Sequence, residues 1–475
     1  MFRIMKFLIG FLVLAASFAI NAQSGRAVSQ NAAKPGVEKV ELTVKQMFDE
    51  ANAYNKTKFA EYEKNKTPYS ENLRLQTERE KKQLAAKYAS IASARAGLAG
   101  EDLYYLGFLH WIAENFDGTT QNLLKFTSQE NSAPDRAQTA RSIVVVVYAK
   151  QKKLVEAEKI LSEYLGKQPQ KLTERSRMEG ELAKAYQSEK DFAKMAPHAE
   201  EAYKASKALA EDPNSRTRGL DELLDSGMLV FEAYRDQNKT KEADTALNDM
   251  QTFAAKVGSP TFFYYATDKL ITYMLETGRK PLAMETYLSS LIKAGRDFQL
   301  KGQQADAIDR LKRREKHYKI LQEPASELFS VEAWFPGEPR TLQALRGKVV
   351  LLDFWATWCT PCFEAFPALS EWHQDLGPEG LVVLGVTRFY GQAEGFKMDN
   401  PNEIDFLKRF KVKQKLAYDF VVLSDQQTQM AYDAMALPTT VLIDRKGKIR
   451  YIEAGTSTSR IEDLRQMILK LLAEK

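Results

Sequence analysis

One segment near the C-terminus restricts the possible folds of this chain more than any other part of it. Residues 349–369 read VVLLDFWATWCTPCFEAFPAL, so an apolar block ends near Trp355 and is followed by Cys359, Pro361 and Cys362. Proline is tolerated in the first turn of a helix, because its missing N–H would have no partner there. The segment therefore predicts a buried strand, a short turn and a helix that begins at Cys359.

Apolar blocks of the same kind recur between helical segments after Phe329, as KVVLLDFW, LVVLGVTRF, YDFVVLS and TTVLID. Buried strands that alternate with helices are typical of an α/β fold with a mainly parallel central sheet. We therefore predict an α/β domain over residues 329–475. The preceding residues 322–328, QEPASEL, combine a proline with small and polar residues, which indicates a linker.

Residues 41–321 differ from this α/β region in composition and in hydrophobic pattern. They are rich in Ala, Lys, Glu, Leu, Tyr and Gln and show little alternation of polar and apolar residues, which is typical of helices joined by short turns. A repeat aligns within them at successive spacings of 38, 38, 48 and 40 residues. Pairs of helices repeated in this way stack into a solenoid, because each pair buries its apolar face only against its neighbours.

The alignment has four columns. The first lies at the turn within each helix pair, the second and third follow it by three and seven residues, and the fourth precedes it by six. In this order the columns contain Phe116, Leu154, Phe192, Thr240 and Lys280; Thr119, Ala157, Met195, Ala243 and Ala283; Leu123, Leu161, Ala199, Leu247 and Tyr287; and His110, Tyr148, Tyr186, Tyr234 and Met274. We predict that they pack between stacked helices, and a groove that binds a protein partner is the alternative. Residues 136–169 resemble a tetratricopeptide repeat.

The N-terminus has the pattern of a secretory signal peptide. Arg3 and Lys6 precede an apolar run over residues 7–20, which ends before Asn21 and Ala22. The run is shorter than the roughly 20 residues that cross a bilayer. We therefore predict a signal peptide at 1–22, a flexible leader at 23–40, and a periplasmic or other extracytoplasmic location. An uncleaved membrane tether is the alternative.

Length and composition narrow the class of protein. A chain of 475 residues is long enough for two or three domains, so we expect a multidomain protein. A hydrophobic content of 44% with 28% charged residues is that of a globular protein. The formal net charge of +5 is too small to indicate a nucleic-acid partner.

The only two cysteines of the chain, Cys359 and Cys362, are three residues apart. A disulfide between them would close so small a loop that it would add little stability, so we expect redox chemistry. The positive end of the helix dipole would lower the pKa of Cys359 from about 8.5 toward 7, which makes Cys359 the predicted nucleophile and Cys362 the shielded resolving cysteine. Zinc needs four ligands, and the four histidines are scattered, so we expect no metal and no cofactor besides this disulfide.

These residues carry a resemblance to a known family. DFWATWCTPC resembles the active-site segment of the thioredoxin superfamily, and the exported context resembles its TlpA/ResA-like branch. LQALRGKVVLLDFWATWC, NEIDFLKRFKV and LPTTVLIDRKGKIRYIEAG match the same branch, so the resemblance covers about residues 328–475. It implies a thioredoxin-like fold and a thiol–disulfide oxidoreductase that acts on protein thiols and disulfides, with a membrane-borne electron donor if it works as a reductase. Together with the helical repeats, we therefore predict an all-α repeat array followed by an α/β thioredoxin-like fold.

The resemblance also assigns roles to residues outside the cysteine pair. Pro438 matches the family's cis-proline, which leaves the backbone at Leu437 free to pair with a bound substrate chain. Asp353 matches a buried acid that exchanges a proton with Cys362. Burial within VVLLDFW should raise the pKa of this carboxyl group, and the alternative is a strand-end aspartate bonded to backbone.

Three residues around the cysteines, Trp358, Thr360 and Pro361, are predicted to form the substrate surface, whereas Trp355 is expected to pack in the core. Some ResA-like proteins have a glutamate three residues after the second cysteine, where this chain has Ala365. Two other functions stay open. One is a peroxiredoxin-like peroxidase, since Thr357 precedes Cys359 by two residues, and the other is a repeat-based binding protein with a thioredoxin-like scaffold.

Overall fold

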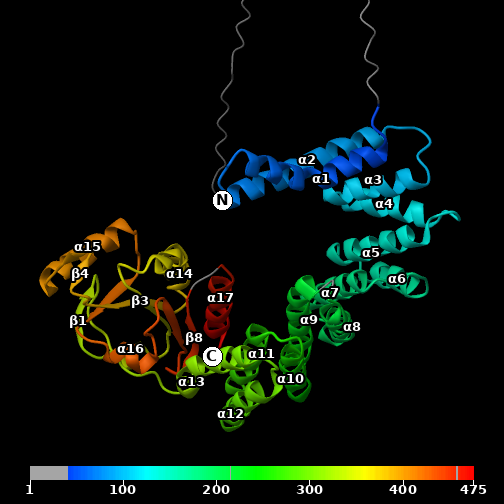
Figure 1. Ribbon diagram of the computed structural model, residues 1–475. Helices are drawn as coiled ribbons and strands as arrows, with labels where there is room; N and C mark the ends of the chain where they lie inside the picture. The colour runs from blue at the N-terminus through cyan, green and yellow to red at the C-terminus, as the bar shows by residue number, and fades with distance from the viewer. Residues whose placement is uncertain (1–40, 214–215, 456–457, 475) are drawn as a thin grey trace, which may run out of the picture.

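A computed structural model describes residues 41–213, 216–455 and 458–474 of the chain (Figure 1). The predicted signal peptide and leader lie outside the described residues. The predicted fold class is confirmed, because helices are the only regular elements of the described residues up to Ile320 and an α/β domain follows. No helix in the described ranges has both the length and the apolar character needed to cross a membrane.

The helical array runs from α1 to α13. Its helices are α1 Val44–Lys64, α2 Glu71–Ser93, α3 Glu101–Ile112, α4 Phe116–Thr127, α5 Pro134–Lys150, α6 Leu154–Leu165, α7 Leu172–Ser188, α8 Phe192–Glu211, α9 Arg216–Asp236, α10 Thr240–Lys256, α11 Pro260–Glu276, α12 Lys280–Asp297 and α13 Lys301–Ile320. Figure 1 shows them as an open arc that begins at α1 and α2 and ends at the α/β domain.

The same turn occurs within five successive helix pairs. The first column of the sequence alignment contains the first residue of α4, α6, α8, α10 and α12. Two residues before it the backbone φ is positive each time, at Glu114, Lys152, Lys190, Asn238 and Gly278. The residue between donates its N–H to the carbonyl group of the fourth column, as from Asn115 to His110 at 2.9 Å. This is the hydrogen bond that ends a helix with a left-handed residue, so the repeat marks one turn geometry used five times.

The second and third alignment columns form the core of the array. Every member of these two columns is at most 4% exposed. The interpretation as packing between stacked helices is therefore confirmed for these two columns. The first column is only partly buried, and of the fourth column only Tyr186 and Met274 are buried. The tetratricopeptide label itself stays a prediction.

The α/β domain is built on a six-stranded sheet with the order β1-β6-β3-β2-β7-β8. The β2–β3 and β3–β6 pairs are parallel, whereas β1–β6, β2–β7 and β7–β8 are antiparallel. The prediction of a mainly parallel sheet is therefore wrong. The strands are β1 Val331–Phe335, β2 Val349–Phe354, β3 Leu381–Arg388, β6 Asp419–Leu423, β7 Thr439–Ile443 and β8 Ile449–Ala454, and β4 Gln392–Ala393 and β5 Phe396–Lys397 form a small separate hairpin.

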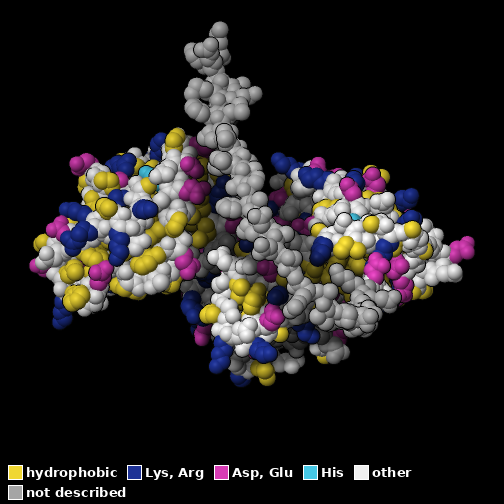
Figure 2. All heavy atoms as spheres, turned by 90° about the horizontal axis from the view of Figure 1, so that it is seen from above, with side chains coloured by type: hydrophobic (Ala, Val, Ile, Leu, Met, Phe, Trp, Pro, Cys, Tyr) yellow, Lys and Arg dark blue, Asp and Glu magenta, His cyan; other side chains and the backbone are white. Residues whose placement is uncertain are grey.

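Helices cover both faces of this sheet. They are η1 Gln343–Leu345 and η2 Thr360–Glu364, which are 3-10 helices, and the α-helices α14 Phe366–Leu376, α15 Asn400–Lys413, α16 Gln427–Tyr432 and α17 Thr458–Ala473. In Figure 2 the α/β domain is the lobe on the left and helices of the array form the lobe on the right, with hydrophobic side chains gathered on the left lobe.

Strand β2 separates two cores. Leu351 and Trp355 pack with the cysteines and with side chains of α14, α15 and α17. Leu352 and Phe354, on the other face, belong to a core that continues into the helices of the array. The two predicted domains therefore share apolar packing, and the end of the array covers a sheet face that would otherwise be exposed.

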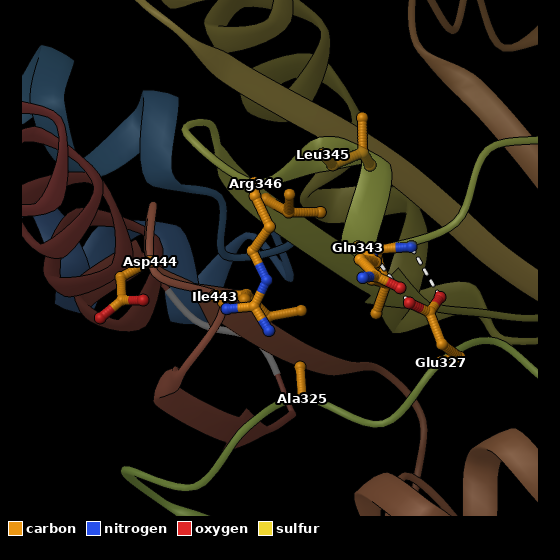
Figure 3. A pocket seen from close by; sticks show the side chains of 10 residues that line it. Ala325, Glu327, Gln343, Leu345, Arg346, Ile443 and Asp444 are labelled. Carbon is orange, nitrogen blue, oxygen red and sulfur yellow. Dashed lines mark hydrogen bonds between the residues drawn. The ribbon is translucent and has the colours of Figure 1, made fainter.

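The predicted linker, residues 322–328, is bonded to the sheet along its length. The N–H of Gln322 donates to the Ile449 carbonyl at 2.7 Å, and the N–H of Ala325 donates to the Gly447 carbonyl at 2.9 Å. The Glu327 carboxylate accepts hydrogen bonds from the backbone N–H groups at the start of η1, across a small pocket (Figure 3). The segment thus connects the two parts without separating them.

Candidate active site

Cys359 and Cys362 form a disulfide at the carboxyl end of β2. Their sulfur atoms are 2.01 Å apart and their Cα atoms 5.4 Å apart, close to the predicted separation of about 5.5 Å. The local helix differs from the prediction, because Cys359 caps the five-residue 3-10 helix η2, and α14 begins only at Phe366. The prediction of a helix that begins at Cys359 is therefore correct only for this tighter turn.

The two cysteines differ in their neighbours more than in their burial. Cys359 is 3% exposed and Cys362 is 1% exposed. Trp358 beside Cys359 is 58% exposed, and Thr360 and Pro361 are exposed as well. The three residues predicted to form a substrate surface therefore lie around Cys359 at the protein surface, whereas both cysteine side chains are buried in the same core.

Asp353 lies on β2 and is 1% exposed. Because side chains alternate along a strand, it shares its sheet face with Leu351 and Trp355, which pack in the same core as the cysteines. Neither carboxylate oxygen has a hydrogen-bond partner among the described residues, so the alternative of a backbone-bonded aspartate is not what the structure shows. Burial raises the pKa of this carboxyl group to about 7, because removal from water penalises the charged form.

A glycine next to Asp353 in the sheet makes room for the Trp355 indole. Asp353 pairs with Gly385 on β3, which pairs with Phe420 on β6. A Cβ atom at Gly385 would lie 3.0 Å from Trp355 Nε1 and 3.1 Å from the Phe420 ring, so glycine allows the indole to lie over the strand. The Trp355 Nε1 and the Tyr418 hydroxyl have no hydrogen-bond partner in the described part of the chain.

Sequence reasoning did not identify Gly385 or Tyr418. Burial, with a smaller contribution from Asp353, raises the pKa of Tyr418 well above its usual value. The tyrosine is the first residue of YDFVVLS and the glycine lies within LVVLGVTRF. A glycine inside an apolar strand is a known sign of close approach, so this signal was available in the sequence.

Pro438 begins the segment that leads into β7. The peptide bond between Leu437 and Pro438 is cis, as the resemblance implied. Pro438 is buried and Leu437 is half-buried, while Met435, two residues earlier, is 52% exposed. The backbone before the proline is thus near the surface, with an exposed methionine that sequence reasoning did not select.

Trp358 rests on a small aromatic platform that sequence reasoning also missed. Its ring meets the Tyr390 ring edge-on at a centroid distance of 5.5 Å, and the Arg388 guanidinium lies 4.1 Å from the centroid of Tyr390. The buried Glu403 carboxylate accepts the N–H groups of Tyr390 and of the next residue at 2.9 and 3.0 Å. The platform holds the exposed indole beside Cys359.

Among the described residues, no three His, Cys, Asp or Glu side chains are grouped so that they could hold a metal ion. Glu364, next to Ala365, is exposed and lies away from the core that contains Asp353. Of the buried acids Asp353 and Glu403, Glu403 is bonded to backbone N–H groups, whereas both Asp353 oxygens lack a partner among the described residues.

Comparison with known proteins gives several matches. The sequence profile of the AhpC/TSA family matches residues 324–452. Thiol-disulfide oxidoreductase ResA from Geobacillus thermodenitrificans (strain NG80-2) is 33% identical over 132 residues, which are 27% of this chain and 67% of that protein. The protein of the same name from Bacillus subtilis (strain 168) is 33% identical over 133 residues, 28% of this chain and 68% of that protein. The solution structure of a thioredoxin-like protein in the oxidized form is 26% identical, covers 33% of this chain and 99% of that one, and has a TM-score of 0.28.

Proposed function

Because this chain belongs to the ResA family of thiol–disulfide oxidoreductases, we propose that its Cys359–Cys362 couple exchanges electrons with protein thiols and disulfides outside the cytoplasm. The predicted signal peptide at 1–22 supports the extracytoplasmic location. The single observation that carries the proposal is the closed Cys359–Cys362 disulfide in the same core as the buried, unpartnered Asp353.

In the reducing direction the reaction begins with both cysteines as thiols. The Cys359 thiolate attacks one sulfur of the substrate disulfide, forms a mixed disulfide and releases the other sulfur as a thiolate, which takes up a proton. Cys362 then loses its proton and attacks the Cys359 sulfur. This second step releases the second substrate thiol and closes the Cys359–Cys362 disulfide, so two electrons pass from the protein to the substrate.

Asp353 suits the second step because of its environment. A carboxyl group with a pKa of about 7 is present in both protonation states near neutral pH, which is the condition for efficient general acid–base catalysis. The carboxylate accepts the Cys362 proton as the sulfur attacks. In the oxidising direction the carboxylic acid returns that proton when the disulfide opens. A membrane-borne electron donor restores the dithiol after each reducing turnover.

The substrate binds across the exposed surface beside Cys359. Trp358, Thr360 and Pro361 contact the substrate side chains, and the backbone at Leu437, before cis-Pro438, pairs with the extended substrate chain. The helical array selects the protein partner, since it is joined to this domain through a shared core.

The test is reduction of insulin disulfides by dithiothreitol in the presence of the full chain. We expect the wild-type protein to accelerate the reaction and Cys359→Ser to abolish the acceleration. Cys362→Ser should accumulate a mixed disulfide with insulin, visible by non-reducing electrophoresis and mass spectrometry. Full activity of Cys359→Ser would contradict the proposal.

A parallel assay with hydrogen peroxide distinguishes the peroxidase alternative. Peroxide consumption faster than insulin reduction would favour that function, and equal behaviour of the wild type and a double Cys→Ser variant in both assays would favour a binding protein. The reduction potential of the couple, measured against glutathione, then gives the direction. Couples of this kind span about −270 to −120 mV, and 30 mV corresponds to about 1.4 kcal/mol.

A further inference from the structure

The array and the α/β domain meet around one buried arginine. Arg314 on α13 is 8% exposed. Its Nε donates to the Asp268 carboxylate on α11 at 3.0 Å, and one terminal nitrogen donates to the Ile452 carbonyl on β8 at 2.9 Å. The other terminal nitrogen lies 3.7 Å from the Glu453 carboxylate. The arginine therefore ties the last helices of the array to the sheet.

The same arginine determines the protonation of His317, one turn later on α13. Arg314 Nη1 lies 2.9 Å from His317 Nδ1. Because an arginine can only donate hydrogen bonds, Nδ1 must accept, and the ring proton must be on Nε2. That nitrogen lies 3.3 Å from the Asp433 carbonyl oxygen and donates to it. Burial and the adjacent Arg314 both lower the pKa of His317, which agrees with a neutral ring.

Asp433 is the residue at which α16 ends. It has a left-handed backbone, with φ of 53°, and it begins the segment that passes through Met435 and Leu437 to cis-Pro438. The preceding residue of α13, Lys316, donates to the Met430 carbonyl in the last turn of α16. Lys316 thus contacts the last turn of α16 and His317 contacts Asp433, where the segment begins. At the other end of the segment, Leu437 packs against the core that contains the two cysteines.

We propose that His317 is a positioning residue for substrate binding: the Arg314–His317 pair of the array holds Asp433, and through it the segment 433–437 that pairs with the substrate chain. The inference rests on the proposed function, since it uses the pairing of a protein substrate with the backbone at Leu437. It makes the last helix of the array a part of the substrate-binding apparatus of the α/β domain.

The decisive variant is His317→Leu. It removes the hydrogen bonds of the ring to Arg314 and to the Asp433 carbonyl, and it fills the buried position with an apolar side chain of similar size. Steady-state kinetics should be measured with insulin and with 4,4′-dithiodipyridine, a small disulfide that has no chain to pair with Leu437. We expect KM for insulin to rise about tenfold, the size expected for one lost hydrogen bond. The kcat for insulin and the rate with dithiodipyridine should stay within about twofold, since the sulfur chemistry is untouched.

Three further measurements separate positioning from general loss of structure. His317→Gln can still donate an N–H toward Asp433 and should recover part of the insulin KM. Hydrogen exchange of peptides covering 433–437 should be faster in His317→Leu, whereas peptides covering the cysteines should be unchanged. Glu276→Gln is the matched control, because it breaks the 3.4 Å ion pair between Lys470 on α17 and α11, an array contact that does not reach this segment, and it should behave as wild type.

Several outcomes would overturn the proposal. An unchanged insulin KM in His317→Leu would do so. So would an equal loss of activity toward insulin and dithiodipyridine in this variant, or a rise in the insulin KM of Glu276→Gln as large as that of His317→Leu. Should His317→Leu not fold, the exposed Lys316→Met removes the contact to Met430 and must raise the insulin KM about two- to threefold. Inactivity of the wild type toward both disulfides would instead refute the proposed function.

Discussion

Replacement of Asp353 by asparagine tests the physical basis of the site. The carboxyl group has a pKa of about 7 in the folded protein, against its ordinary value of 3.8. The folded state therefore binds more protons than the unfolded state between about pH 4 and pH 7, and stability falls as pH rises through that window. A difference of about three pKa units corresponds to about 4 kcal/mol. Asparagine has nearly the same shape and no charge, so it removes this pH-dependent loss.

The measurement is denaturant unfolding of the oxidised protein from pH 4 to pH 8, with wild type and Asp353→Asn compared at each pH. In the oxidised form the cysteines do not titrate. Tryptophan fluorescence reports mainly on the α/β domain, because Trp334, Trp355, Trp358 and Trp372 belong to it and only Trp111 to the array. We expect the asparagine variant to gain stability relative to wild type by about 1.4 kcal/mol per pH unit through this window, with a plateau near 4 kcal/mol above pH 7.

The control is Asp375→Asn on α14, which changes an exposed aspartate and should give a difference that does not vary with pH. A constant difference between Asp353→Asn and wild type over the whole range would refute the reasoning. The same conclusion would follow if the asparagine variant lost stability relative to wild type as pH rose. In the reduced enzyme the variant should also slow closure of the Cys359–Cys362 disulfide, by about 10²- to 10⁴-fold if Asp353 is the general base, as measured by stopped-flow fluorescence.

Three further substitutions test other parts of the structure. Gly385→Ala should destabilise the α/β domain by about 1–3 kcal/mol, since the new methyl group would crowd Trp355 and Phe420 in a closed core; its unfolding midpoint in urea measures this. Arg314→Met should cost about 1–3 kcal/mol, because it leaves the partly buried Asp268 and Glu453 carboxylates and the buried Ile452 carbonyl without their donor, and a midpoint equal to wild type would contradict it. Trp358→Ala should raise KM for insulin several-fold with kcat nearly unchanged, since the exposed indole contributes apolar contact to binding, and an unchanged KM would exclude that role.

Local pattern was sufficient for much of this protein. The repeat columns located the turn within five helix pairs, because the same turn needs the same residue types at fixed offsets. An apolar block followed by two cysteines with a proline between them predicted the redox disulfide. The apolar neighbours of Asp353 predicted the raised pKa of its carboxyl group. The cis bond before Pro438 came from resemblance, since no local pattern distinguishes it from a trans bond.

The amino-acid sequence by itself therefore determined the helix pairs, the change to an α/β domain after them, the cysteine couple and the buried acid, because each depends on neighbours along the chain. Only the tertiary structure decided the mixed strand directions, the 3-10 turn at Cys359 and the pairing of Arg314 with the sheet. The apolar run Val349–Leu352 of β2 indicates that both sheet faces are covered, but not that the array covers one of them. Burial is encoded locally, whereas the identity of the partner that buries a surface depends on contacts between residues more than a hundred positions apart, as between Arg314 and Ile452.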